Sequence, residues 1–216
     1  EIAEPLLTNN SGTSTQVNST EHSNEAMAAP AGKYYKLVVA SLILFSLIVG
    51  YIAAVQPSGA GWRYFSWHPF LMVTGFVGMM GTSAATKKLG GYKNTKMHGI
   101  MASLGLFMAF GGLYVIYNNK KMMGKEHLTS THSIAGIVTM AGCTMAMMAG
   151  GIFLHPDFGV DKTNQTIRFA HKWFARSVMF SGWVTCFLGL KHLTSDIFTL
   201  ALFCLPLLAL APFTLI

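Results

Sequence analysis

The chain has 216 residues, of which 52% are hydrophobic and only 11% are charged, and its formal net charge is +7. Soluble domains usually carry about a quarter charged residues, so this composition argues against a soluble globular protein and favours a membrane protein. The excess of Lys and Arg therefore bears on membrane topology and does not indicate nucleic-acid binding.

Long apolar stretches alternate with short polar connections along the chain. Each stretch holds roughly 20 residues, which is enough for a helix to cross a hydrocarbon core of about 30 Å. Lipid cannot satisfy an open backbone, and the stretches lack the alternation of barrel strands, so we expect helices. The sequence therefore predicts an all-α membrane domain over residues 34–216. Its six transmembrane helices cover residues 37–55, 67–86, 97–117, 132–154, 170–190 and 197–216.

Residues 1–33 precede the first predicted span. They are polar and rich in Ser, Thr and Asn, a composition typical of a disordered segment. The segment has neither the basic start nor the apolar centre of a signal peptide. We therefore expect a disordered tail on the side of the membrane where the N-terminus lies.

The distribution of Lys and Arg predicts which side that is. The tail, the 87–96 connection and the 155–169 connection share one side, and together with the adjoining span ends they bring ten Lys and Arg to it, against five on the other. Cytoplasmic segments carry the excess of positive charge, so both termini should face the cytosol. The N-x-S/T sequons at Asn9, Asn18 and Asn164 lie on this same side and disagree. An N-glycan on any of them would reverse the orientation.

Four of the eight histidines lie near the starts of four consecutive predicted spans, as His68, His98, His132 and His171. Consecutive spans run in opposite directions, so His68 and His132 should lie toward the outer face and the other two toward the cytoplasmic face. A single histidine at a span end is most often a water-bonded interfacial side chain. One histidine on each of four successive helices instead favours a ligand set, because ionisable groups near the membrane interior are functional candidates.

The chemistry of two imidazoles on each side narrows the choice of cofactor. Zinc normally takes three or four ligands, whereas haem needs only two axial ligands because the porphyrin supplies four nitrogens. The sequence has no C-x-x-C-H motif, which excludes covalent c-type haem. A haem-free transporter or scaffold that binds a transition metal or protons stays open. The pairing also stays open, because His127 and His192 face outward and His155 faces inward.

The segments around these histidines are HPFLMVTGF at 68–76, MHG at 97–99, THS at 131–133 and AHKWF at 170–174. They resemble the eukaryotic cytochrome b561 family, and FSWHP at 65–69 and GKEHLTSTH at 124–132 resemble its short domain-containing branch most. The resemblance covers about residues 36–216. It implies a six-helix membrane fold with two b-type haems in the four central helices. By resemblance, His68 and His132 ligate the outer haem iron, and His98 and His171 ligate the cytoplasmic one.

The resemblance also implies a function and a place in the cell. The family is a group of transmembrane oxidoreductases that pass electrons from a cytosolic donor, usually ascorbate, to monodehydroascorbate or ferric iron on the other side. A homodimer and a location in the endoplasmic reticulum or a cytoplasmic vesicle membrane are compatible with this resemblance. Ascorbate-using members carry a longer basic stretch after the second helix and an S-L-H-S-W type motif in the fourth. This chain has KKLGGYKNTK at 87–96 and THSIAG at 131–136, so another cytosolic reductant stays open.

Several cations are candidates for binding anionic groups near the histidines. Lys93 and Lys96 shortly precede His98, and Arg168 precedes His171, so we expect these three to bind the cytosolic donor. The remaining candidates are Lys87 and Lys88 for the propionates of the cytoplasmic haem, Arg63 for those of the outer haem, and Lys125 and His127 for the acceptor. Ordinary positive-inside charge explains any one of the five cytoplasmic cations equally well.

Overall fold

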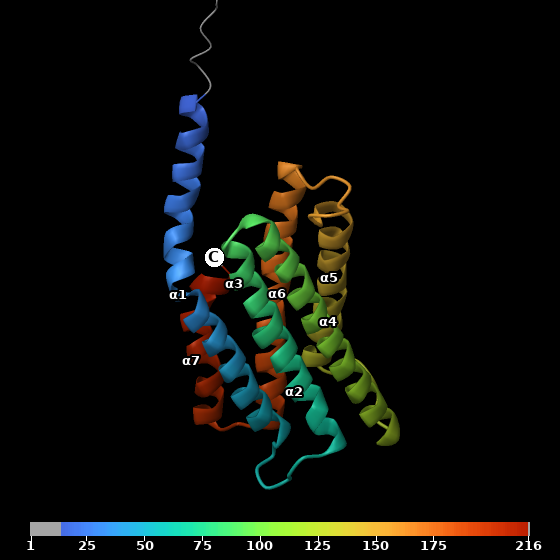
Figure 1. The fold of residues 1–216 in the computed structure, drawn as a ribbon. Coiled ribbons are helices and arrows are strands. Elements are labelled where there is room, and N and C mark those ends of the chain that lie inside the picture. The colour runs from blue at the N-terminus through green and yellow to red at the C-terminus, as the bar shows by residue number, and fades with distance from the viewer. Residues whose placement is uncertain (1–13, 216) are drawn as a thin grey trace, which may run out of the picture.

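The computed structural model describes residues 14–215, with side chains described from Gly32 onward, and every regular element in this part of the chain is helical. The expected all-α class is confirmed. In chain order (Figure 1) the elements are α1 (Ser14–Ala54), the 3-10 turn η1 (Tyr64–Ser66), α2 (Trp67–Val73), the π-helical turn η2 (Thr74–Met79), α3 (Met80–Lys88), α4 (Gly91–Met122), α5 (Thr131–Leu154), α6 (Gln165–Leu193) and α7 (Ile197–Thr214).

Four of these helices are long and apolar enough to cross a membrane, namely α1 over Gly32–Ala54, α4, α5 and α7. The segment α2–η2–α3 is helical without interruption over residues 67–88, but the π turn divides it into short elements. Helix α6 has 29 residues and carries several Lys and Arg among them. The chain is therefore an integral membrane protein.

Helix α1 begins well before the first predicted span. Residues 14–33, part of the segment expected to be a disordered tail, are drawn as a helix continuous with that span. Nucleation is the costly step of helix formation, and propagation adds one hydrogen bond for each residue that is fixed. A stable spanning helix can thus extend into a polar segment, and α1 projects beyond the bundle (Figure 1). The rest of the predicted tail, including Asn9, lies outside the described residues.

Helices α4 and α6 also begin before the predicted spans, at Gly91 and Gln165. Local chemistry explains both starts. Gly90 and Gly91 have φ values of 69° and 77°, which permit the tight reversal from α3 into α4. Asn164 caps α6 by accepting hydrogen bonds from the N–H groups of Thr166 and Ile167. The apolar runs therefore mark where these helices enter the bilayer and not where they begin.

The π turn η2 lies at the centre of the bundle, where Thr74 to Gly78 are all buried. Opposite it, α4 approaches so closely that the two backbones touch. A Cβ on Gly75 would lie 2.8 Å from the carbonyl oxygen of Gly105, and a Cβ on Gly105 would lie 2.9 Å from that of Gly75. Small residues permit this close approach of membrane helices. The Gly75–Gly105 crossing fixes the register between α2–α3 and α4.

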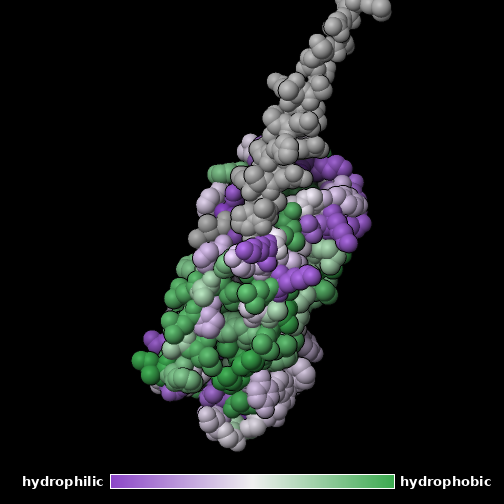
Figure 2. All heavy atoms as spheres, turned by 60° about the vertical axis from the view of Figure 1, so that its left-hand side comes forward, coloured by the Kyte–Doolittle hydropathy of each residue, from purple (hydrophilic) through white to green (hydrophobic). Residues whose placement is uncertain are grey.

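The surface agrees with a membrane location. Figure 2 shows hydrophobic side chains over the middle of one face and hydrophilic ones gathered toward an end. Large apolar side chains such as Phe107 are exposed along the helices, as lipid-facing residues would be. Trp62 packs edge to face against Trp67 and Phe70 near the start of α2, which is typical of an aromatic belt at the membrane interface.

Candidate functional site

The four histidines singled out above lie in four different helices: His68 in α2, His98 in α4, His132 in α5 and His171 in α6. His68 and His132 are at the bundle end that holds the connections 55–66 and 123–130, and we call them the first pair. His98 and His171 are at the end that holds the connection 155–164, and we call them the second pair. The structure thus separates the four side chains into two pairs at opposite ends.

The two rings of the first pair face each other. Their centroids are 6.1 Å apart, and their planes are inclined by 75°. A bond of about 2 Å from each imidazole nitrogen to a shared metal, plus about 1 Å from nitrogen to ring centre, gives a separation of roughly 6 Å. The first pair therefore has the spacing of two axial ligands on opposite sides of one metal ion.

Hydrogen bonds orient both rings of the first pair. Nδ1 of His68 lies 3.0 Å from the carbonyl oxygen of Gly112, and Nδ1 of His132 lies 3.0 Å from that of Thr185. A carbonyl oxygen can only accept, so each Nδ1 carries the hydrogen. Each Nε2 keeps its lone pair, which is the arrangement found for histidines that bind metals.

A cavity of about 430 Å³ adjoins both rings of the first pair, a size typical of small-molecule sites. Its walls are mostly apolar side chains, with glycines where the helices come closest. A Cβ on Gly189 would lie 2.8 Å from Cε1 of His132, so glycine leaves the space that this ring occupies. The apolar wall includes Val49, Phe65, Met72, Phe76 and Leu113. Such a lining fits a flat, apolar macrocycle held by two imidazoles.

The second pair is oriented less completely. Nδ1 of His98 lies 3.0 Å from the carbonyl oxygen of Ser83 and 2.8 Å from its hydroxyl oxygen. Nδ1 of His171 is buried and has no hydrogen-bond partner among the described residues. His98 and His171 lie within electrostatic range of each other. One ring is therefore held by its surroundings, and the other is free to adjust.

Helices α5 and α6 support their histidines reciprocally. Just as Gly189 of α6 faces the ring of His132, Gly150 of α5 faces the ring of His171, with its Cβ position 3.0 Å from Cε1. Gly150 follows His132 by 18 residues, and Gly189 follows His171 by 18 residues. The antiparallel register thus presents each ring to a glycine of the partner helix, which makes the two ends similar in construction.

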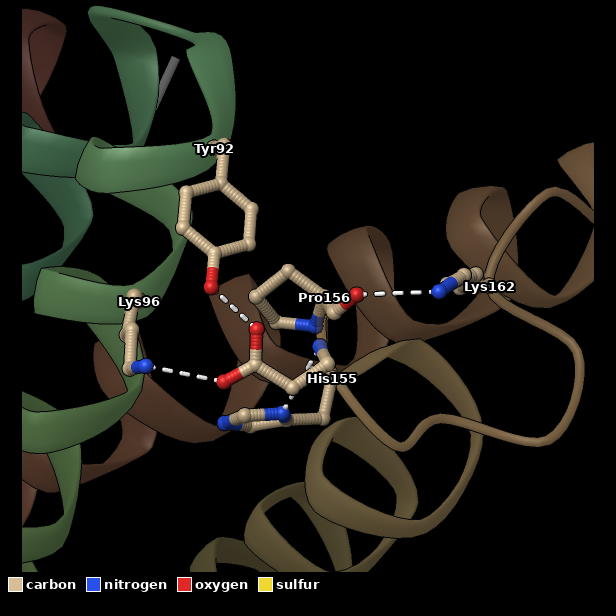
Figure 3. Close-up of polar contacts among 6 residues, drawn as sticks. Tyr92, Lys96, His155, Pro156 and Lys162 are labelled. Atoms are coloured by element: carbon tan, nitrogen blue, oxygen red, sulfur yellow. Dashed lines mark hydrogen bonds and ion pairs between the residues drawn. The ribbon is translucent and has the colours of Figure 1, made fainter.

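The cations expected to bind a donor lie at the second-pair end, and two of them already have partners. Lys96 Nζ lies 2.8 Å from Oδ2 of Asp157, and the Tyr92 hydroxyl donates a hydrogen bond to the same carboxylate (Figure 3). The hydrogen bond from Lys96, and then that from Tyr92, hold the pKa of Asp157 below its usual value. Arg168 donates from Nε to the carbonyl oxygen of Lys162, at 2.7 Å.

Asp157 is a residue that sequence reasoning missed. It lies in the connection between α5 and α6, 61 residues from Lys96, so no spacing rule joins the two side chains. The neighbouring Lys162 also donates within this connection, from Nζ to the carbonyl oxygen of Pro156, as Figure 3 shows. The connection is therefore tied both to itself and to α4. Lys93, the third expected donor contact, is exposed.

The two lysines expected to pair with propionates have different surroundings. Lys87 Nζ donates to the hydroxyl of Thr95 at 2.6 Å, and its charge acts on both His98 and His171. Lys88 Nζ donates to the carbonyl oxygen of Pro212 in α7, at 2.8 Å. Of these two lysines, Lys87 lies within electrostatic range of both rings of the second pair.

At the first-pair end, His127 lines the cavity and stacks on Tyr117 with the ring centroids 4.7 Å apart. Arg63 donates from its guanidinium to the carbonyl oxygen of Gln56, and neither it nor Lys125 is among the described residues that line the cavity. Two more residues line the cavity: Lys120, which sequence reasoning missed, and His192, which was an open alternative for the histidine pairing. The second lies with its ring centroid 6.2 Å from that of His132. To place these two residues from the sequence, one would need to know which side chains at the ends of α4 and α6 face the cavity.

Two imidazole pairs at opposite ends of an apolar helical bundle define a membrane protein of the cytochrome type. Residues 67–198 match the family model of eukaryotic cytochrome b561, and the chain belongs to that family. All four histidines lie inside the matched range, so the resemblance found in the sequence is confirmed. Family membership implies b-type haem, and the spacing, tautomers and apolar cavity of the first pair fit that group.

The chain is also similar to proteins named transmembrane reductase CYB561D2. It is 26% identical to the mouse protein over 148 residues, which are 65% of this chain and 63% of the mouse protein. It is 25% identical to the bovine protein over 148 residues, with the same two shares. The chain therefore spans less than two thirds of the length of these curated relatives.

Proposed function

We propose that this protein carries single electrons across a membrane through two b-type haems. One would lie between His68 and His132 and the other between His98 and His171. The observation that carries the proposal is the first pair: two facing imidazoles, 6.1 Å between centroids, with both Nδ1 atoms bonded to carbonyl oxygens and a cavity beside them. The reciprocal glycines of α5 and α6 support an equivalent site at the other end.

Transfer across the whole bilayer requires that the four histidine-bearing helices cross it, and with α1 and α7 the proposal counts six spans. Residues 67–88 form 22 consecutive helical residues, which at 1.5 Å each measure about 33 Å and suffice to cross. In α6, the charges of Lys172 and Arg176 lie 5.7 and 5.1 Å from the ring of Trp173. Aromatic rings and long basic side chains gather at the membrane interface. These features support counting both segments as spans.

The proposed orientation places both termini and the second pair on the cytosolic side, in a membrane of the endoplasmic reticulum or a vesicle. The Lys and Arg count supports it. The structure adds an argument about the sequon at Asn164. This side chain caps α6 and also donates to Asp161, so its amide is already engaged in local structure and a glycan would have to replace these contacts.

The proposed substrates are ascorbate as the cytosolic donor and monodehydroascorbate or ferric iron as the acceptor. The naming of the mouse and bovine relatives as transmembrane reductases supports this class of reaction. When bound, a haem with two histidine ligands exchanges single electrons and has no open position for oxygen. The histidines would present Nε2 to the iron, and Nδ1 hydrogen bonds hold the rings of His68, His98 and His132 in place. The apolar walls of the first-pair cavity would exclude water.

The proposed contacts for charged groups lie at the two ends. Lys93, Lys96 and Arg168 would bind the anionic donor, and Lys87 and Lys88 the propionates at the cytosolic end. Arg63 would serve the propionates at the other end, where Lys125 and His127 would bind the acceptor. An assembly of two copies of the chain is compatible with this arrangement, because each copy contains both histidine pairs.

The test is a dithionite-reduced minus oxidised absorption spectrum of the detergent-purified protein, with haem counted per chain as the pyridine haemochrome. We expect two b-type haems per chain and about one in His68→Ala or His98→Ala. Ascorbate added outside inverted vesicles should then reduce an acceptor trapped inside. A protein that stays colourless after haem supplementation would overturn the proposal, and the histidines would become candidates for metal or proton binding.

A further inference from the structure

Ser83 of α3 makes three polar contacts with His98, more than the Nδ1 partner of His68 or of His132 makes with its histidine. Its hydroxyl oxygen lies 2.8 Å from Nδ1 of His98 and 2.8 Å from the His98 carbonyl oxygen, and its own carbonyl oxygen lies 3.0 Å from the same Nδ1. Only 1% of the Ser83 side chain is exposed. Water therefore does not compete for these three contacts.

The directions of these hydrogen bonds follow from the groups involved. The Ser83 hydroxyl can donate only one hydrogen, and the carbonyl oxygens of His98 and Ser83 can only accept. The hydroxyl hydrogen therefore goes to the His98 carbonyl, and the hydroxyl oxygen is left to accept from Nδ1–H together with the Ser83 carbonyl. Ser83 thus fixes the hydrogen of His98 on Nδ1 and leaves Nε2 free for the iron.

The fold places Ser83 opposite His98 through the π turn. Gly105 of α4 lies seven residues from both His98 and Gly112, whereas Gly75 lies seven residues from His68 but eight from Ser83. Gly75 and Gly105 touch at the crossing. In a regular α-helix, the His68–Gly112 contact on one side of this crossing and the Ser83–His98 contact on the other would differ in register by one residue. The wider turn of η2 absorbs this extra residue, and π turns of this kind are frequent at functional sites.

We propose that Ser83 is a positioning residue that sets the electron-donating strength of His98 and thereby lowers the reduction potential of the haem at the second pair. This inference rests on the function proposed above. An acceptor on the far nitrogen of a metal-bound histidine raises the basicity of the imidazole, and a more basic ligand stabilises the oxidised iron. His171 has no such acceptor among the described residues, so Ser83 is the group that acts on this site.

Removing the Ser83 hydroxyl should raise the reduction potential of the second-pair haem by a measurable amount. Ser83→Ala removes the hydroxyl acceptor but keeps the backbone carbonyl, so His98 should still bind haem. The equilibrium constant for reducing the second-pair haem should rise about threefold to tenfold, and tenfold corresponds to about 59 mV for one electron. The first-pair haem is at the other end of the bundle, and its potential should not change.

The experiment is a potentiometric redox measurement on the purified holoprotein, with the haem content and the EPR g-values recorded for each variant. Thr82→Val is the matched control, because Thr82 is the adjacent buried hydroxyl and its oxygen has no hydrogen-bond partner among the described residues. Ser83→Thr keeps the hydroxyl and should keep the potential of the wild-type protein.

The outcomes distinguish a failure of the role proposed for Ser83 from a failure of the proposed electron-transfer function. A rise in one potential in Ser83→Ala but not in Thr82→Val supports the role of Ser83. Loss of one haem in Ser83→Ala would overturn it, because the hydroxyl would then be needed for haem binding and not for setting the potential. Two haems with unchanged potentials and g-values in Ser83→Ala would overturn it while leaving the proposed function intact. An equal change in Ser83→Ala and Thr82→Val would also overturn it, since any buried change would then suffice. A wild-type protein without haem would instead contradict the proposed function itself.

Discussion

The two ends of the bundle carry the same residue type in equivalent helices, yet they hold it differently. Both rings of the first pair have a backbone carbonyl on Nδ1 and border one cavity. In the second pair, Ser83 holds His98, whereas Nδ1 of His171 has no partner among the described residues. The first pair is therefore a preformed site, and the second retains one adjustable ligand. A rigid site tolerates little change in its walls, while an adjustable one can absorb it.

Substituting the glycines that face the rings of His132 and His171 should have the largest effect and so tests this difference most directly. Gly189→Ala would place a Cβ 2.8 Å from Cε1 of His132, whose ring is also fixed by Thr185 and cannot retreat. Overpacking of this kind typically costs 1–3 kcal/mol, and we expect it to displace the ring and remove one haem per chain. Gly150→Ala, at 3.0 Å from His171, should have a smaller effect because that ring can shift.

Haem content and the reduced absorption spectrum measure both variants. Gly151→Ala is the matched control, since a Cβ there would meet nothing within 4 Å, and it should retain the full haem content. Equal haem loss in Gly189→Ala and Gly150→Ala would show that the two histidines are held equally firmly. The contrast between a preformed and an adjustable site would then be wrong.

Substitutions that alter donor binding at the second-pair end should have effects of intermediate size. Lys87 acts electrostatically on both histidines there, whereas Lys96 is neutralised by Asp157. We therefore expect Lys87→Ala to raise the KM for an anionic donor more than Lys96→Ala does. Asp157→Asn should lower the KM about twofold to fivefold by freeing Lys96, an effect on the scale of an exposed ion pair. Initial rates of haem reduction at several ascorbate concentrations measure all three.

The pH dependence of this ion pair has a fixed sign. Hydrogen bonds from Lys96 and Tyr92 lower the pKa of Asp157 in the folded protein, so the pairing is complete above the ordinary Asp pKa of about 4. It is lost only as the pH falls through the lower folded value. The KM ratio of Asp157→Asn to the unaltered protein should thus stay constant from about pH 8 to pH 5. A ratio that changes steeply across this interval would assign the effect to another group.

The sequence predicted the parts of this molecule that depend on local pattern. Apolar length was sufficient to predict a helical membrane protein, and one histidine on each of four consecutive spans predicts His68, His98, His132 and His171 as its ligands. Ser83 and Asp157 could not be found in this way. Ser83 reaches His98 because a π turn shifts the register by one residue, and Asp157 reaches Lys96 across 61 residues. Hydropathy contains neither piece of information.

Helix boundaries were missed for a related reason. A hydropathy pattern records where a helix enters lipid, but capping groups decide where it begins. Asn164 and the Gly90–Gly91 turn start α6 and α4 in polar sequence, and α1 continues backwards to Ser14. The polar first turns of α4 and α6 matter for function, because they bring Tyr92, Lys96 and the 155–164 connection beside the second pair.

Removing the N-terminal cap of α6 should have the smallest effect of the changes considered. Oδ1 of Asn164 accepts hydrogen bonds from the N–H groups of Thr166 and Ile167 at 2.9 and 3.1 Å. Asn164→Ala should destabilise the start of α6 by about 1 kcal/mol. His171 lies two turns further along, and its Nδ1 has no hydrogen-bond partner among the described residues. The second-pair haem should therefore be released at a lower temperature than in the unaltered protein, with the first-pair haem unaffected.

Thr166→Ala separates the cap from the sequon, since it removes the N-x-T pattern but leaves Asn164 in place. A thermal scan of the reduced absorption band should therefore resemble the unaltered protein for Thr166→Ala and show early partial bleaching for Asn164→Ala. If both variants bleach early and gain electrophoretic mobility, Asn164 carries a glycan. The second pair would then lie on the non-cytosolic side, and the direction of electron transfer proposed above would be reversed.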